Sequence, residues 1–530
     1  MRHLPAACAK VAAECASSLG WLSERFRYDN VECSEVIPKA RLPQSDIQKL
    51  LALEKIEPAD PRRARGTCRV FTVDELAKQR RRCIQHTRDI NDCIKEVDPV
   101  SFLPWQERHL AVLSGSHVID LDFSAFYDQM ELDDAVRDFF VFEAHGKFYR
   151  MKVLSMGQRQ SVGVAHRITQ QLLNFEHKSA HTEPYIDNTR FVGSRAAVIE
   201  DATMFLWRCF EANVTCNEVQ LAGLRNRLND VRNGRQLEAA DEKELAEGKC
   251  WEDLVKLWIR KEAENIVKTN CDWLGEAYDY EQKTVWTSEK TRQKIRAIME
   301  HTDEWTWRNF AAATALLIYA SRTLDLKLSR YFAALRAYRE ASTLLQAAPE
   351  AWEKQAVMEP HTKKAFKAWA DEVLAAEPRK VNRSPPLKWT IMTDASVWGY
   401  GALIAGADGT IRTIAHPWSQ SERENGLNAE HSTEAEPMAI YKVLCEAIPP
   451  GERATARIIT DHDPAVYALK KGYAKSFNIN KVCYWIQNTF PDLELSVEHI
   501  AGSKNSADGI SRGKQLTWSD WKNFVGVLDV

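Results

Sequence analysis

The C-terminal part of the chain places acidic residues where predicted strands end and predicted helices begin. Residues 387–406 read LKWTIMTDASVWGYGALIAG and predict a strand, a turn and a second strand, with Asp394 closing the first strand. The β-branched run ARIITD ends in Asp461, Glu436 begins a predicted helix, and Asp508 begins another. Clustered carboxylates repel one another, and divalent cations are the usual compensation. This order of elements predicts a cation site, for which isolated surface acids at turns are the alternative.

Composition limits the classes of protein that remain. The chain has 530 residues, 45% of them hydrophobic, which fits a soluble globular protein of about three to four domains and argues against disorder. Its 71 Lys and Arg nearly balance 74 Asp and Glu, so any nucleic-acid binding must depend on local patches. Residues 62–82 form one such patch, with eight basic residues against two acidic ones, whereas residues 385–530 are slightly acidic.

Cysteine usage and hydropathy bear on the compartment. The 12 cysteines are scattered without CxxC pairs, which argues against a zinc site or a disulfide framework and favours a reducing, intracellular compartment, the nucleus or the cytoplasm. The longest apolar stretch, residues 310–320, is about half the roughly 20 residues of a membrane span, so no transmembrane segment is expected. Residues 1–22 fit a weak mitochondrial presequence or an amphipathic helix, and we favour the helix.

Periodicity and turn residues divide the rest of the chain. The predicted strands and turns are a buried strand in 116–128, a hairpin over 139–153 with its tip at His145 and Gly146, two strands in 183–197 around a turn at Asp187 and Asn188, and strands around Gly275 in 271–285. The predicted helical regions are 1–61 as an extension, 161–175, an inserted hairpin or arm over 217–268, and 287–376. Residues 377–386 (EPRKVNRSPP) predict a linker.

Four segments of the C-terminal part together match a known family. The segments TDAS, EPMA, TDHDP and HIAGSKNSADGISR resemble the catalytic blocks of ribonuclease H domains attached to retroelement reverse transcriptases. The resemblance implies an α/β domain with a mixed five-stranded sheet over 387–515, followed by a tail over 516–530. It also implies that two Mg²⁺ or Mn²⁺ ions are held, for cleavage of the RNA strand of an RNA–DNA hybrid, by Asp394, Glu436, Asp461 and Asp508.

The same blocks assign supporting roles. His499 would be a catalytic residue and Asn505 a supporting residue near the scissile phosphate, because both stand in the HIAGSKNSADGISR segment. Glu434 is the rival of Glu436 as the second ligand, but its neighbours fit the E-x-x-A block less well.

Upstream segments resemble the polymerase half of the same family. DFSAFYDQ is similar to motif A and implies Asp122 as a metal ligand, with Tyr127 under the incoming sugar. VLSMGQ is similar to motif B and implies nucleotide or template contacts at Gly157 and Gln158. YIDN is similar to motif C and implies Asp187 as the second metal ligand. WLGEAYDYEQKT resembles the primer-grip hairpin, and RRRCIQHTRDIN resembles the basic fingers strand, which implies phosphate contacts by Arg80 and Arg82.

One residue departs from the family pattern. Asn188 stands where motif C usually has a second Asp, which removes one negative charge but keeps a carbonyl oxygen. The change should weaken Mg²⁺ binding without changing the shape of the site. Three interpretations of the upstream half remain open: an active polymerase, an impaired polymerase, or a fold that only holds a duplex. We favour retained activity, because motifs A and B and the primer grip remain recognisable.

The combined resemblance implies an α+β right-hand polymerase followed by a ribonuclease H domain. Fingers and palm would occupy residues 62–286 and a helical thumb or connection residues 287–376. The implied activity is RNA- and DNA-templated DNA synthesis coupled to RNA hydrolysis, with RNA template, DNA primer, dNTPs, hybrid and other retroelement proteins as partners. Within the family, the chain is most similar to gypsy-like or tyrosine-recombinase elements, the latter including the trypanosomatid VIPER elements. The alternatives are a ribonuclease H with a degenerate polymerase half, or a domesticated RNA-binding scaffold.

Overall fold

The computed structural model describes residues 36–75, 80–93, 99–233, 238–428 and 433–528. The chain divides into two compact units, residues 1–273 with 278–283 and residues 274–277 with 284–530. The helix expected in residues 1–22 lies outside the described residues. Within the described residues, no helix is both long and apolar enough to cross a membrane.

The first unit begins with two small antiparallel sheets. One has the strand order β1-β6-β5, and the other pairs β2 with β3. Their bounds are β1 Ile56–Pro58, β2 Arg69–Glu75, β3 Arg80–His86, β5 Val141–Ala144 and β6 Lys147–Met151. The predicted β5–β6 hairpin is confirmed, with His145 and Gly146 both at positive φ in its turn. The basic patch of the sequence therefore lies largely on the β2–β3 ribbon and the short helical turn Pro61–Arg63 before it.

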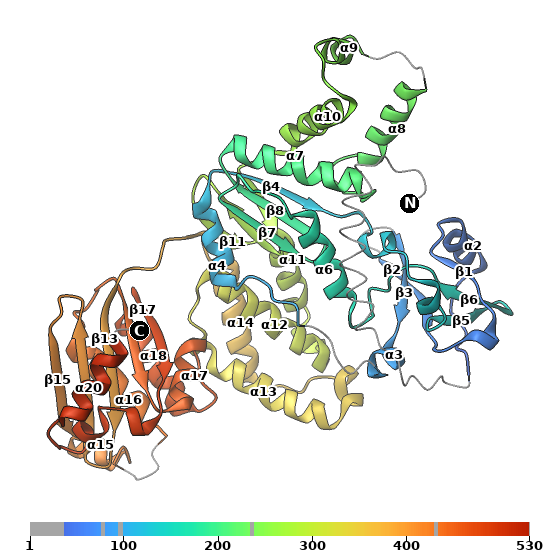
Figure 1. Cartoon of the computed structure of the whole chain (residues 1–530). Helices are drawn as coiled ribbons and strands as arrows, with labels where there is room; N and C mark the ends of the chain where they lie inside the picture. The colour runs from blue at the N-terminus through green and yellow to red at the C-terminus, as the bar shows by residue number, and fades with distance from the viewer. Residues whose placement is uncertain (1–35, 76–79, 94–98, 234–237, 429–432, 529–530) are drawn as a thin grey trace. The chain divides into compact units, whose positions relative to one another are not determined.

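A third sheet, with the order β4-β8-β7, carries the motif A and motif C segments. Its strands are β4 His117–Asp122, β7 His181–Tyr185 and β8 Asn188–Gly193. Helix α7 (Arg195–Glu211) packs along β4 and β8, and α6 (Ser161–Leu172) lies beside β7 (Figure 1). The predicted turn at Asp187 and Asn188 is shifted by one residue: Ile186 takes the positive φ of 58°, and Asn188 already belongs to β8 because it pairs with Tyr185.

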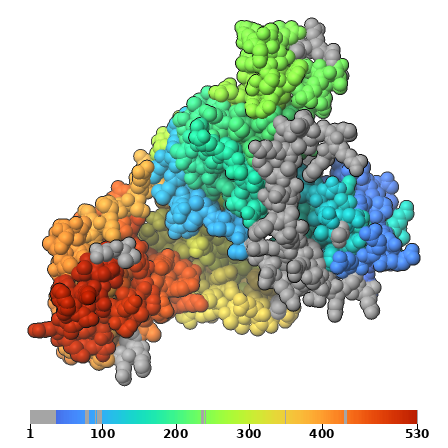
Figure 2. Space-filling view, viewed as in Figure 1, coloured from blue at the N-terminus to red at the C-terminus, as the bar shows by residue number. Residues whose placement is uncertain are grey.

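The inserted arm consists of three helices instead of the predicted hairpin. They are α8 Leu221–Arg232, α9 Ala239–Ala246 and α10 Trp251–Ile266. Leu254 and Trp258 of α10 are buried in the same apolar core as Phe205 of α7, so the base of the arm is packed on the sheet-bearing part of the unit. The arm projects in the space-filling view (Figure 2). The remaining elements of this unit are α2 Gln44–Ala52, α3 Arg88–Cys93, α4 Trp105–Leu110, α5 Asp134–Arg137 and β9 Asn270–Trp273.

The second unit opens with the predicted helical region. Its helices are α11 Glu289–Met299, α12 Trp307–Leu324, α13 Phe332–Ala347 and α14 Pro360–Ala375, and they share a core built on Phe310, Phe366 and Trp369. Strand β10 (Glu276–Asp279) lies where the chain passes between the units. Strand β11 (Thr284–Thr287) pairs with β12 (Arg379–Lys380), so the segment predicted as a linker contains a short strand.

A mixed five-stranded sheet follows, as predicted. Its order is β15-β14-β13-β16-β17, with β13, β14 and β15 antiparallel and β16 parallel to both β13 and β17. The strands are β13 Leu387–Ala395, β14 Gly399–Gly406, β15 Ile411–Pro417, β16 Ala454–Thr460 and β17 Leu493–His499. Helices accompany it as α15 Gln420–Glu424, α16 Ala435–Ala447, α17 Asp463–Lys471, α18 Phe477–Thr489, α19 Asp508–Ser511 and α20 Trp518–Leu528.

Neighbouring residues of β13 supply the two faces of this sheet. Ile391 packs into the core that includes Val443 of α16, and Met392 packs into the core that includes Phe524 of α20. This alternation follows from the two-residue period of a strand. The residues predicted as a tail thus form a helix with a fully buried aromatic side chain.

Candidate functional site

Three carboxylates of the second unit converge at one edge of the five-stranded sheet. Asp394, Glu436 and Asp461 each offer an oxygen, and these three oxygens all lie within 4.8 Å of one another. Strands β13 and β16 are parallel, so the acids at their carboxyl ends reach the same edge. Glu436 joins them from the first turn of α16. We call this group the Asp394 cluster.

Neutral polar groups hold the carboxylates in place. Asn505 donates its Nδ2 to Asp394 Oδ1 at 3.3 Å and to Asp461 Oδ1 at 3.2 Å, and it is buried. The Ser511 hydroxyl donates to the other oxygen of Asp394. The Ala395 amide donates to Glu436 Oε1 at 2.9 Å. Each carboxylate of the cluster is therefore oriented by a donor from another part of the domain.

The electrostatics of the cluster fit a bound divalent cation. Burial, together with the charges of Asp461 and Asp508, raises the pKa of Asp394 to about 7 despite the hydrogen bond from Ser511. Burial and the charge of Asp394 raise the pKa of Glu436 to about 9. Glu436 Oε2 is buried and has no hydrogen-bond partner among the described residues. A hard cation would relieve this repulsion and satisfy that oxygen.

The other acids predicted for this site lie differently. Asp508 is outside the 4.8 Å group and accepts two hydrogen bonds from Arg512, at 2.9 and 2.7 Å, although its charge reaches Asp394. Glu434 pairs with Lys481 at 3.1 Å and is not part of the cluster, which favours Glu436 over its rival.

His499 ends strand β17, opposite Thr460 in the parallel ladder. It therefore lies at the same sheet edge as Asp461, which follows Thr460 directly. Its Nε2 is 3.6 Å from Asp463 Oδ1, and 44% of its side chain is exposed. The imidazole is therefore accessible from solvent at this edge.

Two glycines permit the close packing around the cluster. A Cβ at Gly502 would stand 2.8 Å from Asp461 Oδ2, and a Cβ at Gly401 would stand 2.5 Å from the Ser511 amide nitrogen. The contact at Gly401 is with backbone, so this position requires glycine, whereas a Cβ at Gly502 would displace the Asp461 carboxylate.

In the first unit, Asp122, Asp187 and Asn188 form a second polar group, the Asp122 site. Asp122 is paired with Asn188 across β4 and β8, and the Phe123 amide donates to the Asp187 carbonyl at 3.0 Å. The Asn188 amide donates to Asp187 Oδ1 at 3.1 Å. The segments of motifs A and C are thus adjacent, and the amide of Asn188 occupies one lone pair of the neighbouring carboxylate.

Two residues that the sequence did not single out contact Asp122. Asn217 donates its Nδ2 to Asp122 Oδ2 at 2.8 Å, and Glu218 Oε2 accepts from the Asp122 amide at 2.9 Å. Burial raises the pKa of Glu218, and the charges of Asp122 and Asp120 raise it further. Burial also raises the pKa of Asp187. Glu218 therefore adds a carboxylate beside Asp122.

The predicted nucleotide and template contacts lie on several elements of the first unit. Tyr127 is buried, and burial together with the charge of Asp187 raises its pKa to about 12, so the ring lies near that carboxylate. A Cβ at Gly157 would stand 2.7 Å from the Gln85 carbonyl, and Gln158 is buried. Arg80 and Arg82 lie on β3, where Arg82 contacts the Met156 sulfur at 2.7 Å.

The missed contacts share one property. Asn217 and Glu218 are about a hundred residues from Asp122 in sequence, and Ser511 is 117 residues from Asp394. The ADxxSR pattern contains Ser511 and Arg512 and offered a signal for both. No local pattern marks Asn217 and Glu218, because the short β-bridge between Phe123 and Cys216 that brings them to β4 is a tertiary contact.

Comparison with known proteins gives likenesses of structure only. No protein-family model matches the sequence, and no curated protein matches it either. Solved structures with some similarity include the foamy viral protease-reverse transcriptase dRH in complex with ds DNA, at 12% identity and a TM-score of 0.45, covering 88% of this chain and 73% of that one. The foamy viral protease-reverse transcriptase in complex with RNA/DNA hybrid has 12% identity and a TM-score of 0.41, over 92% of this chain and 60% of that one. The same protein in complex with dsDNA has 12% identity and a TM-score of 0.41, over 91% and 94%.

Proposed function

We propose that this chain is a retroelement-type reverse transcriptase with ribonuclease H activity. The observation that carries the proposal is the Asp394 cluster: three carboxylates from two parallel strands and one helix, within 4.8 Å and with one buried oxygen unpaired. Such a cluster at the edge of a mixed sheet suits cleavage of phosphodiester bonds. Its substrate would be the RNA strand of an RNA–DNA hybrid.

Asp394, Glu436 and Asp461 would hold two divalent ions, Mg²⁺ or Mn²⁺, with Asp508 as a fourth carboxylate. Bound ions would lower the pKa of an attacking water and neutralise the charge that develops on the phosphate. The chain itself contributes orientation, because Asn505 spans Asp394 and Asp461 while Ser511 fixes the second oxygen of Asp394. The exposed His499 would contact the scissile region from the end of β17.

The Asp122 site would perform DNA synthesis. Asp122 and Asp187 would supply the carboxylates that hold divalent ions beside a primer 3′-hydroxyl and a dNTP. Tyr127 lies near Asp187, where its ring would stand against the sugar and exclude a 2′-hydroxyl. Under this proposal the first unit supplies fingers and palm, helices α11 to α14 a thumb or connection, and Arg80 and Arg82 contacts to phosphates.

A second candidate is a ribonuclease H whose upstream half only holds the duplex. The observation that favours it is the Asn188 amide, which replaces a carboxylate and donates to Asp187 Oδ1. A donor at that position competes with a cation for the same carboxylate oxygen. Glu218 favours the first candidate, the active reverse transcriptase, because it adds an acid close to Asp122.

Two assays on purified protein test these candidates. A labelled RNA–DNA hybrid should be cleaved in Mg²⁺ by the wild type and not by Asp394→Asn. A DNA primer on an RNA template should be extended with dNTPs in Mg²⁺ or Mn²⁺, and Asp122→Asn should abolish this. Cleavage without any extension selects the second candidate, and the absence of both activities despite hybrid binding rejects the proposal.

A further inference from the structure

The second unit contains a groove that the proposed catalytic chemistry does not use. It lies between α12 and α13 on one side and α17, the following loop and α18 on the other, and it encloses about 470 Å³. That volume falls within the roughly 300–1,000 Å³ typical of ligand sites. The two sides are tied by a buried hydrogen bond from Asn480 Nδ2 to the Ser329 carbonyl, at 2.9 Å.

The charged residues that line the groove are all positive. Arg339, Lys471 and Lys475 line it, and none of its lining residues is acidic. Among the described residues, none of these three cations forms a salt bridge with a carboxylate, although salt bridges are numerous elsewhere in the unit. The groove therefore offers unneutralised positive charge to an anionic ligand.

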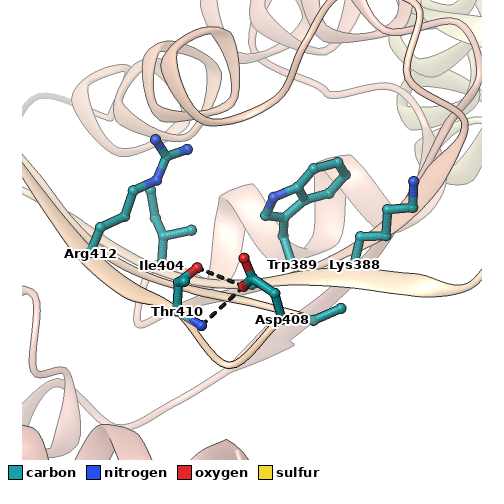
Figure 3. Close-up of a pocket in the computed structure, with 8 residues that line it drawn as sticks. Lys388, Trp389, Ile404, Asp408, Thr410 and Arg412 are labelled. Atoms are coloured by element: carbon teal, nitrogen blue, oxygen red, sulfur yellow. Dashed lines mark hydrogen bonds between the residues drawn. The ribbon is translucent and has the colours of Figure 1, made fainter.

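A second hollow in the same unit provides a contrast. It is lined by Lys388, Trp389 and Arg412 near the β14–β15 turn, where Asp408 accepts hydrogen bonds from Thr410 (Figure 3). Lys388 pairs with Glu452, and Arg412 donates to the Ala447 carbonyl at 2.9 Å. Its cations are already engaged by the protein, so this hollow has little to offer an anion.

Aromatic rings accompany the cations in the groove. Tyr338, Tyr467 and Tyr473 line it, and Tyr467 is 66% exposed. Lys471 Nζ lies over the Tyr467 ring, 4.6 Å from its centre, so the charge stands against one face of the ring. Buried Leu335 and Ile479 provide an apolar floor. Exposed rings flanked by cations are the elements with which proteins bind unpaired bases and the phosphates between them.

We propose that this groove binds a single-stranded segment of nucleic acid, with a base against Tyr467 and its phosphates near Lys471 and Arg339. A duplex is the less suitable occupant, since its base faces are stacked on one another and cannot enter an apolar hollow. Other anions with an aromatic ring share the chemistry that the groove recognises. We choose nucleic acid among them on the basis of the proposed function. The groove would hold an unpaired strand on the same unit as the Asp394 cluster.

A crosslinking experiment on the full chain locates the strand. The probe is a dT12 oligonucleotide with 4-thiothymidine, irradiated in complex with the protein and mapped by mass spectrometry. We expect crosslinked peptides from α17 and residues 472–476, containing Tyr467 or Tyr473. Crosslinks found only in other parts of the chain overturn the inference.

Binding measurements identify what the groove recognises. Fluorescence anisotropy with labelled dT12 should show roughly tenfold weaker binding for Tyr467→Ala. Lys471→Gln should lower the slope of log affinity against log salt by about 0.7. Tyr484→Ala, a 41% exposed tyrosine outside the groove, and Lys470→Gln should change neither quantity. Tyr467 and Lys471 are exposed, so melting curves should match the wild type.

Two further probes separate the outcomes. The affinity for a dT12 analogue with abasic sites should be the same in the wild type and in Tyr467→Ala. The affinity for a blunt 12-base-pair duplex should likewise not change with Tyr467→Ala. Equal sensitivity for duplex and single strand overturns the inference, because it indicates backbone contact alone. Groove crosslinks in a protein that neither cleaves a hybrid nor extends a primer would reject the proposed function and keep this inference. Hybrid cleavage without groove crosslinks would do the reverse.

Discussion

The Asp394 cluster and the Asp122 site use the same side-chain chemistry at very different charge densities. In the cluster, three carboxylates lie within 4.8 Å, and the pKa values of Asp394 and Glu436 rise to about 7 and 9. At the Asp122 site, Asn188 supplies an amide, and Asn217 donates to Asp122. Within the described residues, the Asp122 site does not form a comparable group of three acids.

The difference shows how one additional carboxylate changes the affinity of a site for a divalent cation. Buried carboxylates that lie close together repel one another, and a divalent cation relieves this repulsion on binding. The described residues form no such group of three acids at the Asp122 site, so a cation has less repulsion to relieve there. We therefore expect the cluster to bind metal more tightly than the Asp122 site.

The largest effect is expected when the cluster loses a charge. Asp394→Asn should lower hybrid cleavage on the order of a thousandfold, because several kcal/mol of charge stabilisation in the transition state is removed. Cleavage rates at saturating Mg²⁺ measure this. Glu434→Gln is the matched control, since Glu434 pairs with Lys481 outside the cluster, and its rate should stay within about twofold of wild type. A similar loss in both variants would contradict the assignment of Glu436.

The difference in charge between the two sites can be reduced by replacing Asn188 of the Asp122 site with an acid. Asn188→Asp replaces a donor to Asp187 with a third carboxylate, and should lower the Mg²⁺ concentration for half-maximal primer extension roughly tenfold, or about 1.4 kcal/mol. Asn174→Asp, an exposed position in the same unit, should leave the requirement unchanged. An unchanged requirement in Asn188→Asp would place the metal away from β8.

The two regions should also differ in their response to pH without metal. The carboxyls of Asp394 and Glu436 keep their protons in the folded state above their ordinary pKa values of 3.8 and 4.5. The stability that this contributes is fully present below those values and is lost as the pH rises through about 7 and 9. We expect the melting temperature in EDTA to fall by a few degrees between pH 5 and 9, and Glu436→Gln to remove most of that fall.

The first unit contains a carboxylate, Glu183, whose pKa is shifted in the opposite direction. Burial alone would raise the pKa of Glu183, but His181 and Arg190 lower it to about 2. Its contribution is therefore present above the ordinary pKa of 4.5 and is lost only as the pH falls through about 2. A fall above pH 5 that persists in Glu436→Gln would come from Asp394, or from Asp187 and Glu218 in the first unit, because burial raises the pKa of each of these carboxyls.

The smallest effect concerns the fourth acid. Arg512 and Asp508 form a pair in which both side chains are about half exposed, at 55% and 47%. Exposed pairs contribute up to about 1 kcal/mol, so Arg512→Gln should lower the Mg²⁺ concentration for half-maximal cleavage by less than about fivefold. Lys514→Gln provides the control for loss of a nearby positive charge. A higher Mg²⁺ requirement in Arg512→Gln would show that Arg512 helps to place Asp508.

Sequence patterns predicted most of the elements that carry the sites, because strand periodicity and terminal acids are local. They predicted the β13–β14 hairpin and the placement of Asp394, Glu436 and Asp461 at element ends. The turn before Asn188 was displaced by one residue, since pairing with Tyr185 overrides the turn preference of Asp and Asn. The arm gained a helix because Gly248, at positive φ, breaks the helical run before Cys250 caps α10.

Helix α20 has a practical consequence for anyone who shortens the protein. Phe524 is fully enclosed beside Met392, the Val527 carbonyl accepts from Arg457 of β16, and the Ser506 hydroxyl donates to the Asp520 carbonyl. A version ended after residue 515 would uncover the face of the sheet on which Phe524 packs against Met392 and Ile459. Such a protein should aggregate, and it should lose the proposed nuclease activity although every acidic residue of the cluster remains.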